Sequence, residues 1–378
     1  MNQDNRISKL PYNYLFCKIL GWWVLAIKNR FMNKIFTAFF ILLLACSNNN
    51  VFGQDPQFSQ YYAAPLYLNP GLAGINQAGR AGVNYRNQWP AIDASFETFS
   101  AWIDYHFDEN NSSAGLIVTR DQEGQAGLSS TAVGLQYAYE LELTYNWVFR
   151  PGFQLSYTTR DLNFSQLTFG DQFDNTGLVN PTTIETFDNG LRINYFDLAL
   201  GGIFYSGNLW VGGALHNLLE PDQSLIDGDG ADSPLPRRFS LHGGYRLPLR
   251  STSTLRGQTA DGRERSVTPS FNYRSQGKFD QLDLGVFFTF EPIILGLWYR
   301  GIPIKTVEGF SNNESIIIHL GLRKGNFNFG YSYDITISEL GINTGGAHEA
   351  SLIYNFRIGP PKPPKEVQRL RCPVPFIF

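Results

Sequence analysis

The 378-residue sequence has little charge, little cysteine and no marked excess of either sign of charge. Charged residues make up 17% of the chain, whereas a typical soluble protein carries roughly 25%. The formal net charge is −3, which indicates neither a basic surface for nucleic acid nor an acidic solvating tail. Only three cysteines are present, and two of them precede residue 50. A disulfide-stabilised fold is therefore not expected.

No apolar run is long enough to form a transmembrane helix. The most hydrophobic stretch, Ile35–Cys46, has 12 residues, whereas crossing a bilayer takes roughly 20. It follows a lysine and precedes a polar region that ends in Val51–Gly53, which is the order of a secretory signal. We predict cleavage after Gly53, so residues 1–53 are interpreted as a removed signal peptide.

The first residues do not fit that signal. We interpret residues 1–31 as the product of a mis-called start and take Met32 as the true one. Leu43–Cys46 also resembles a lipobox in which Cys46 would be acylated. Cleavage after Gly53 is the better interpretation, because the mature chain then starts directly at the segment Asp55–Gly74. On this interpretation Cys372 is the single cysteine of the mature chain.

The chain is rich in glycine, with 37 residues, and in aromatic residues, which make up 15%. From residue 80 to residue 358 its hydrophobicity has a period of two. Phe196, Leu198 and Leu200, for example, alternate with Asp197 and Ala199. Successive strand side chains point to opposite faces, so each such segment has one apolar face and one polar or small face.

Three features favour a membrane barrel over a soluble sandwich. The segments run about 9 to 13 residues, enough to cross a bilayer at a tilt, whereas soluble strands average about 5 or 6. Aromatic residues collect at the strand ends, as in the pairs Tyr145 with Trp147 and Trp298 with Tyr299. The second face is polar or glycine, which fits a water-facing lumen and not a dry core.

We predict an all-β fold, a transmembrane antiparallel β-barrel of about fourteen strands over residues 80–358. An N-terminal periplasmic or plug segment, 54–79, precedes it, and a proline-rich C-terminal tail, 359–378, follows it. The candidate strands are 80–89, 97–107, 113–121, 128–140, 144–159, 163–169, 193–206, 208–217, 237–248, 266–275, 278–290, 292–301, 314–324, 326–334 and 347–358. Since such barrels favour even numbers, one candidate is surplus, and 163–169 is the weakest.

The connections differ in length. The turns at 108–112, 207 and 324–325 are short, while 161–190, 218–236 and 251–265 are long and polar, as expected of periplasmic turns and outer loops. The long connection 218–236 contains Asp227–Pro234, which offers three aspartates but lacks the downstream glutamate of an EF-hand. A solvated acidic loop is the stronger interpretation, and we expect no metal or other cofactor.

No pattern indicates catalysis. The five histidines are dispersed, and four of them, His106, His216, His242 and His319, face the lumen singly on the predicted strand phases. No zinc spacing, GxSxG or phosphate loop occurs. We therefore expect a protein that is not an enzyme.

The segment Asp55–Gly74, DPQFSQYYAAPLYLNPGLAG, resembles the N-terminal signature of the PorP/SprF family of the type IX secretion system. Gly71 stands where the family commonly has alanine. Further motifs appear in the family's order and span the mature chain: Arg86-x-Gln88-Trp89, Phe169–Gln172, Gly330–Asp334, Ser338-x-Leu340, Gly346–Glu349 and Arg371–Pro373.

The resemblance implies an integral outer-membrane barrel without enzymatic activity, associated with type IX secretion and gliding. It implies one of two roles, between which the motif does not choose: an anchor that accepts the C-terminal domain of a large secreted adhesin after export, or a part of the translocation and gliding machinery that links to a periplasmic peptidoglycan-binding lipoprotein. Lipid of the outer membrane surrounds such a barrel, and no nucleic acid is implied. The alternative is a diffusion channel or a substrate-specific uptake barrel.

Turn signals at Asn69–Gly71 and Ala73-Gly74 indicate that the motif itself is not a strand. Its apolar side chains need burial, so we expect it to fold into the lumen or against the periplasmic rim. A plug or lid is favoured over direct contact with a partner. The candidate partner-binding residues are Phe58, Tyr61, Tyr62, Tyr67, Asn69 and Cys372.

Overall fold

The computed structural model describes residues 54–92, 96–124, 127–163, 167, 169–174, 177–178, 183–184, 191–225, 233–249, 263–307, 310–338, 341–358, 370 and 372–375. The signal-peptide prediction, the three aspartates of the candidate calcium loop, and residues 359–369, 371 and 376–378 of the predicted tail lie outside this part of the chain. Among the described residues, no helix is both long enough and apolar enough to span a membrane.

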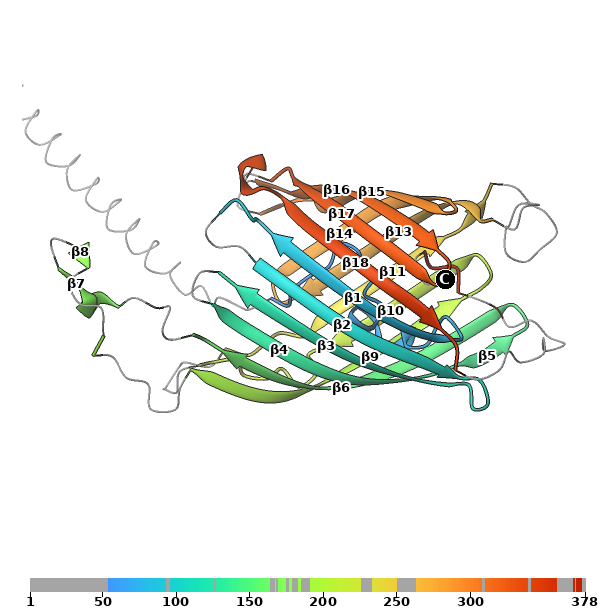
Figure 1. Ribbon diagram of the computed structural model, residues 1–378, viewed down its shortest axis with the longest axis horizontal. Helices are drawn as coiled ribbons and strands as arrows, with labels where there is room; N and C mark the ends of the chain where they lie inside the picture. The colour runs from blue at the N-terminus through green and yellow to red at the C-terminus, as the bar shows by residue number, and fades with distance from the viewer. Residues whose placement is uncertain are drawn as a thin grey trace, which may run out of the picture. The chain divides into compact units, whose positions relative to one another are not determined.

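The protein is a closed antiparallel barrel of 14 strands (Figure 1). The ring runs β1, β2, β3, β4, β6, β9, β10, β11, β13, β14, β15, β16, β17 and β18, and β18 pairs back with β1. The bounds are β1 Gly79–Gln88, β2 Phe96–Phe107, β3 Ser112–Glu123, β4 Leu128–Tyr139, β6 Trp147–Asp161, β9 Arg192–Tyr205, β10 Leu209–His216, β11 Arg238–Tyr245, β13 Arg265–Gln276, β14 Phe279–Phe290, β15 Ile293–Val307, β16 Phe310–Lys324, β17 Phe327–Thr336 and β18 Ala347–Phe356. Closure gives both edges of every strand a partner, which lipid could not provide.

Short elements complete the fold. β5 (Leu141–Thr144) and β12 (Leu247–Pro248) extend the sheet beside β6 and β13, and β7 (Phe173–Asp174) pairs with β8 (Gly177–Leu178). The helical turns are α2 (Pro65–Leu68), η1 (Pro70–Leu72), η3 (Gly170–Gln172) and η4 (Ile342–Thr344). The prediction of about fourteen strands is confirmed, and the described residues of the weak candidate 163–169 lie in no strand.

The period-two pattern separates an outward apolar face from an inward face. Leu135 and Phe196 are each 60% exposed, whereas their neighbours Gln136 and Asp197 are 4% and 6% exposed. The four histidines expected in the lumen are indeed buried there, while His348 is exposed. The outward band of aliphatic and aromatic side chains is what a membrane-spanning barrel presents to lipid.

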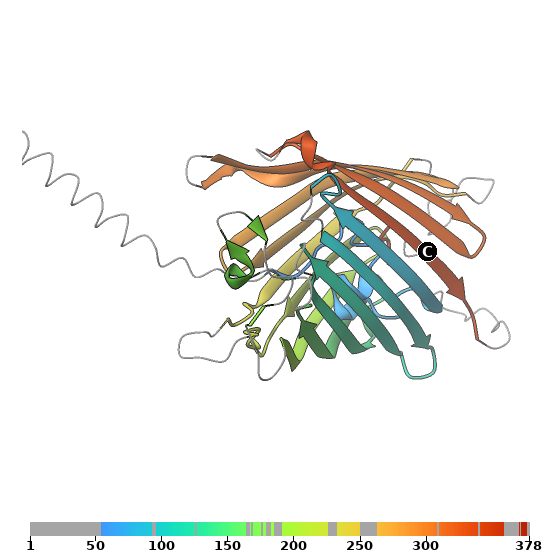
Figure 2. The ribbon, with the colours of Figure 1, turned by 60° about the vertical axis from the view of Figure 1, so that its left-hand side comes forward.

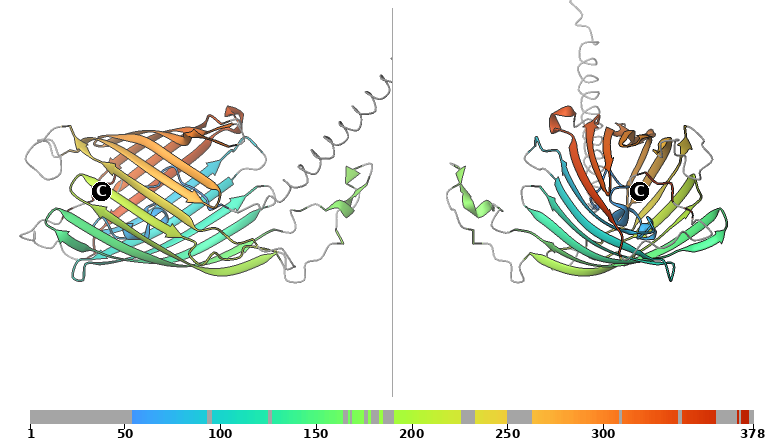
Figure 3. Two further views of the ribbon diagram at one scale, coloured as in Figure 1. Left: turned by 180° about the vertical axis from the view of Figure 1, so that it is seen from behind. Right: turned by 45° about the vertical axis from the view of Figure 1, so that its right-hand side comes forward.

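The inward face was predicted to be polar or glycine, but the structure also places large apolar side chains on it. Trp298, expected at a strand end facing the membrane interface, is 2% exposed and points inward. It joins Ile203, Trp210, Phe287 and other inward side chains in a buried apolar cluster. The inward face can be apolar here because the N-terminal segment covers it from within. Figures 2 and 3 show this segment, in blue, inside the ring of strands.

Strand direction assigns each connection to one end of the barrel. The connections 162–191 and 217–237 lie at the end where β6 and β10 finish, which we call the loop end. The opposite end, the turn end, carries the short turns 108–111, 206–208, 291–292 and 325–326. The connection 246–264 also lies at the turn end, so the expectation that all long connections share one end is wrong.

Candidate functional site: the N-terminal segment inside the barrel

The N-terminal segment, residues 54–78, runs through the lumen from the loop end to the turn end. At the loop end, Asp55 pairs with Arg238 at 3.2 Å and accepts a hydrogen bond from Asn217 at 2.8 Å. At the turn end, Gln77 donates to the Leu370 carbonyl at 3.0 Å. The segment then continues directly into β1. The lumen is therefore occupied along its length by the chain's own residues.

Two prolines and an asparagine shape the middle of the segment. Pro65 stands in the first turn of α2, where its missing N–H costs nothing, and Asn69 caps η1 by accepting from the Gly71 N–H at 2.8 Å. The Asn69 amide donates to two wall carbonyls, those of Gly202 at 3.0 Å and Gly213 at 3.1 Å. Asn69 thus ends α2 with its backbone N–H, which donates to the Pro65 carbonyl, while its side chain caps η1 and fixes this turn to β9 and β10.

Glycines in the wall allow the segment to lie directly against the backbone of the strands. A Cβ added at Gly152 would stand 2.6 Å from the Gly71 nitrogen, and one at Gly201 would stand 2.2 Å from Asn69 Oδ1. On the segment itself, a Cβ at Gly71 would stand 2.6 Å from the Arg150 carbonyl oxygen. These approaches are closer than any side chain tolerates, so glycine is required on both sides of the contact.

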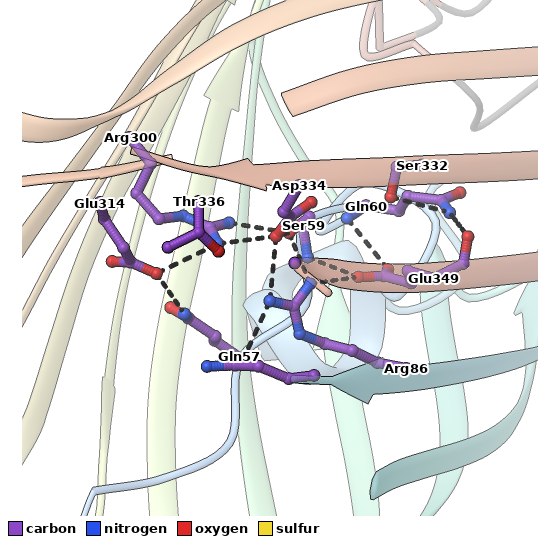
Figure 4. A network of polar contacts seen from close by, with 12 residues as sticks. Gln57, Ser59, Gln60, Arg86, Arg300, Glu314, Ser332, Asp334, Thr336 and Glu349 are labelled. Atoms are coloured by element: carbon purple, nitrogen blue, oxygen red, sulfur yellow. Dashed lines mark hydrogen bonds and ion pairs between the residues drawn. The ribbon is translucent and has the colours of Figure 1, made fainter. Parts of the chain in front are cut away.

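Ser59 is the centre of a buried polar network (Figure 4). Its hydroxyl donates to Asp334 Oδ2 at 2.5 Å and accepts from Arg86 Nη1 at 2.7 Å and Arg300 Nη2 at 2.9 Å. Its backbone N–H donates to Glu349 Oε2 at 2.7 Å. One residue of the segment therefore joins side chains from β1, β15, β17 and β18.

The wall around Ser59 holds two cations and three carboxylates: Arg86 and Arg300, with Asp283, Asp334 and Glu349. Arg86 lies 2.9 Å from Asp334 and 3.4 Å from Glu349, and Arg300 lies 2.9 Å from Asp283 and 3.0 Å from Asp334. All five are almost fully buried. The wall alone therefore has more buried negative charge than positive charge, which is costly without further donors.

The segment supplies those donors. The Ser59 and Gln60 N–H groups bond the two oxygens of Glu349, at 2.7 Å and 3.0 Å. The Gln60 amide donates to the Glu349 carbonyl at 2.9 Å and accepts from Ser351 at 2.7 Å. A buried carboxylate that lost these N–H groups would bear a desolvation cost of about 1–3 kcal/mol or more. The wall and the segment are thus complementary.

Aromatic residues fix the segment on its other side. Tyr61 packs edge-on to Trp298, with ring centroids 5.3 Å apart, and Tyr62 packs edge-on to Trp210 at 6.0 Å. Trp210 Nε1 also donates to the Tyr62 hydroxyl at 3.2 Å. Burial raises the pKa of both tyrosines above the usual range, so both phenols stay neutral and act as packing groups with a polar tip.

Tyr67 connects the segment to the loop end. Its ring meets Phe58 edge-on at 5.2 Å, and its hydroxyl donates to the Pro56 carbonyl at 2.6 Å. Arg238 donates to the same hydroxyl at 3.0 Å and lies 4.8 Å from the ring centre. Burial raises the pKa of Tyr67 to about 12, so the phenol remains protonated beside the guanidinium.

Two further buried arginines hold the end of the segment. Arg80 pairs with Asp104, whose second role is to accept the Gly74 N–H at 2.8 Å. Arg150 pairs with Glu140 and donates to the carbonyl of Ala73 at 2.5 Å. Neither arginine was among the residues predicted from sequence, although a charged side chain on the inward phase of a strand was an available signal for each.

The chain's end returns to the same core. Cys372 and Val374 are fully buried in the cluster that contains Tyr61 and Tyr62. Burial raises the pKa of the Cys372 thiol to about 12, which makes it an unreactive packing group. Residues 372–375 are therefore packed against the interior of the barrel.

All six candidate partner-binding residues lie inside the lumen. Phe58, Tyr61, Tyr62, Tyr67, Asn69 and Cys372 are buried or half-buried, and they belong to one assembly. Several other motif residues converge on the same segment: Arg86, Ser332, Asp334 and Glu349 all contact Ser59 or Gln60. Motifs far apart in the sequence therefore occur together because they hold one plug.

The family model described as type IX secretion system membrane protein PorP/SprF matches residues 50–354. None of the curated proteins matches the sequence.

Solved structures similar to the chain include two transporters and an outer-membrane protein. The Ralstonia pickettii toluene transporter TbuX shares 9% identity over 79% of this chain and 94% of its own, with a TM-score of 0.44. The P. putida toluene transporter TodX shares 12% over 77% and 93%, with a TM-score of 0.41. Acinetobacter baumannii Omp33 shares 8% over 75% and 100%, with a TM-score of 0.37. At such identities and scores none of them bears on function.

Proposed function

The chain belongs to the PorP/SprF family of type IX secretion system membrane proteins, and from that membership we propose that it anchors, or assists the export of, a large surface adhesin. In this proposal it is a non-enzymatic integral protein of the outer membrane that acts in secretion and gliding. It accepts the C-terminal domain of the adhesin after export.

The observation that carries the proposal is the occupied lumen. A diffusion channel needs a water-filled path, whereas here the segment 54–78 crosses the lumen and is tied to the wall at both ends. Ser59 alone bonds side chains of four strands. A barrel closed in this way suits a scaffold better than a pore, because its interior is used for stability and its surface remains for partners.

The ends of the barrel suggest where partners would bind. Long connections face outward in barrels of this type, so we propose that the loop end, with 162–191 and 217–237, is extracellular and receives the adhesin. The turn end, with the return of the chain at 372–375, would then face the periplasm and a peptidoglycan-binding lipoprotein.

Affinity purification from native membranes tests the proposal. A tagged copy of the protein is extracted in mild detergent, and an unrelated tagged outer-membrane barrel serves as the control. We expect one large surface protein to co-purify with this barrel and not with the control. Recovery of the barrel alone, together with a steady open conductance in planar bilayers, would instead identify a channel or an uptake barrel.

A further inference from the structure

The outward face of the barrel is hollowed over four neighbouring strands. A groove of about 440 Å³ lies on β18, β1, β2 and β3, which stand side by side in Figure 1. Ala81 and Ala101 contribute short outward side chains to it, whereas Ile103, Leu116 and Tyr354 beside them are large and exposed. None of the described residues that line the groove is charged. The groove is therefore an apolar surface.

Lipid surrounds this groove, because it lies within the outward apolar band of the barrel. A hollow left unfilled forfeits the dispersion contacts of the atoms that line it. The volume of the groove is within the range of small-ligand sites, roughly 300–1,000 Å³. An acyl chain is apolar and flexible, and the bilayer supplies it on every side. The groove therefore suits an acyl chain.

Arg120 adds a charge at the loop-end side of the groove. On β3, Leu116 and Val118 line the groove, and Arg120 is the next outward side chain toward the loop end. Residues two apart on a strand are separated by about 6.7 Å, so the long Arg120 side chain starts beside the groove. Arg120 is exposed, and within the described part of the chain its guanidinium has no ion pair or hydrogen bond. The planar fork of an arginine matches the oxygens of a phosphate.

A row of polar residues sets the depth of Arg120 in the membrane. Thr131 on β4 is opposite Arg120 in register. Thr159 on β6 and Asn194 on β9 continue the row, and the Thr159 hydroxyl donates to Asn194 Oδ1 at 2.7 Å. On these three strands, the next outward residues toward the turn end are exposed aliphatic and aromatic residues: Val133, Tyr157 and Phe196. The polar row therefore marks the loop-end boundary of the apolar band, where lipid headgroups begin.

We propose that this face binds a phosphorylated glycolipid of the outer leaflet, with an acyl chain in the groove and a phosphate on Arg120. The hydroxyl and amide groups of the polar row both donate and accept hydrogen bonds, as the hydroxyls of a sugar headgroup require. The choice of leaflet rests on the orientation proposed above, in which the loop end is extracellular. The site needs no adhesin, so its test is separate from that of the anchoring role.

Native mass spectrometry of the intact protein, released from detergent micelles, tests the assignment. The lipids added are lipid A, its chemically dephosphorylated form, and phosphatidylglycerol. Arg120→Gln removes the charge, and Lys324→Gln, at the turn end of β16, is its control. Ala101→Phe fills the groove, and Val211→Phe, on the outward face of β10, is its control. Heat-modifiable migration on gels verifies that each variant is folded.

The intact protein should bind lipid A at least fivefold more tightly than either the dephosphorylated form or phosphatidylglycerol. Arg120→Gln should lose the preference for lipid A over its dephosphorylated form, because only the phosphate contact is removed. Ala101→Phe should weaken the binding of both forms fivefold or more, because the added ring takes the place of the acyl chain. The two control variants should bind all three lipids as the unaltered protein does.

Equal affinity of the intact protein for lipid A and its dephosphorylated form would overturn the role of Arg120. Unchanged binding in folded Ala101→Phe would overturn the groove as the site of the acyl chain. A preference for phosphatidylglycerol over lipid A would overturn the choice of a glycolipid. Each of these outcomes is independent of whether an adhesin co-purifies with the barrel.

Discussion

Ser59 shows how much a single hydroxyl can hold together in a barrel lumen. It is the acceptor for two guanidinium groups and a donor to one carboxylate, in a site nearly closed to water. Hydrogen bonds to charged groups are stronger than those between neutral groups, and they are stronger still in a medium of low dielectric constant. Loss of the Ser59 hydroxyl should therefore lower the stability of the barrel.

Replacing Ser59 with alanine should lower the free energy of unfolding by about 1–3 kcal/mol, because two buried arginines lose an acceptor. The surface hydroxyl of Ser112 provides the control, and Ser112→Ala should change stability by no more than about 0.5 kcal/mol. Denaturant unfolding in detergent, followed by tryptophan fluorescence, measures both. Equal stability of the two variants would mean that Ser59 does not hold the plug.

The thiol of Cys372 should be inert while the protein is folded. With its pKa raised to about 12, only roughly one molecule in ten thousand carries the thiolate at pH 8, and the group is also inaccessible. Maleimide labelling followed by peptide mass spectrometry should find Cys372 unmodified in native protein and modified after denaturation. Rapid modification of the native protein would place the end of the chain outside the lumen.

At the scale of elements, the outward faces of the strands were predictable and the contents of the lumen were not. The alternation of apolar and polar residues shows both where a strand runs and which of its side chains face outward. For this reason all fourteen strands of the barrel were among the candidates. The inward position of Trp298 could not be inferred, because an aromatic residue at a strand end also suits a membrane interface. The turn chemistry of Asn69–Gly71 indicated a non-strand segment, but only the fold reveals that Gly152 and Gly201 make room for it.

Gly152→Ala should displace the segment and reduce stability by about 1–3 kcal/mol, because the added Cβ meets the backbone of Pro70 and Gly71. Gly207→Ala is the matched control, since a Cβ there meets nothing within 4 Å. Limited proteolysis near residue 54 and thermal unfolding in detergent report the two effects. If both variants behaved alike, the segment would not rest against β6.

The buried pair Arg80 and Asp104 offers a second test at this scale, because it joins β1 to β2 and both to the segment. Arg80→Met should destabilise the barrel by about 3–5 kcal/mol, since it leaves Asp104 buried without its partner. Adding Asp104→Leu should recover part of that loss, although the Gly74 N–H then lacks an acceptor. If the double variant were no more stable than Arg80→Met, the main role of the Asp104 carboxylate would be to accept the Gly74 N–H of the segment.

For the whole molecule, the contacts inside the barrel involve residues of the motifs that resemble the family. The chain belongs to the PorP/SprF family. The motif residues Arg86, Asp334 and Glu349 meet at Ser59 of the N-terminal segment, so in this chain they hold a closed barrel together. Under the proposed function, a partner would bind on the surface, at the loop end or the turn end. Residues for such a contact could not be predicted from the sequence, because loop contacts follow no period.

Deleting residues 55–74 separates the two roles of the segment. If the segment serves only to close the lumen, the folded deletion variant should still retain the adhesin at the cell surface. Lost retention together with intact heat-modifiable migration would show that the segment also contributes to partner binding. Immunodetection of the adhesin on whole cells gives the measurement.

Single-channel conductance in planar bilayers tests the closed lumen most directly. The intact protein should show no steady open pore, whereas the folded deletion of residues 55–74 should conduct. Gly152→Ala combined with Gly201→Ala gives a second opened variant if the deletion does not fold, because both changes crowd the segment. A steady conductance of the intact protein equal to that of the opened variants would contradict a plugged barrel.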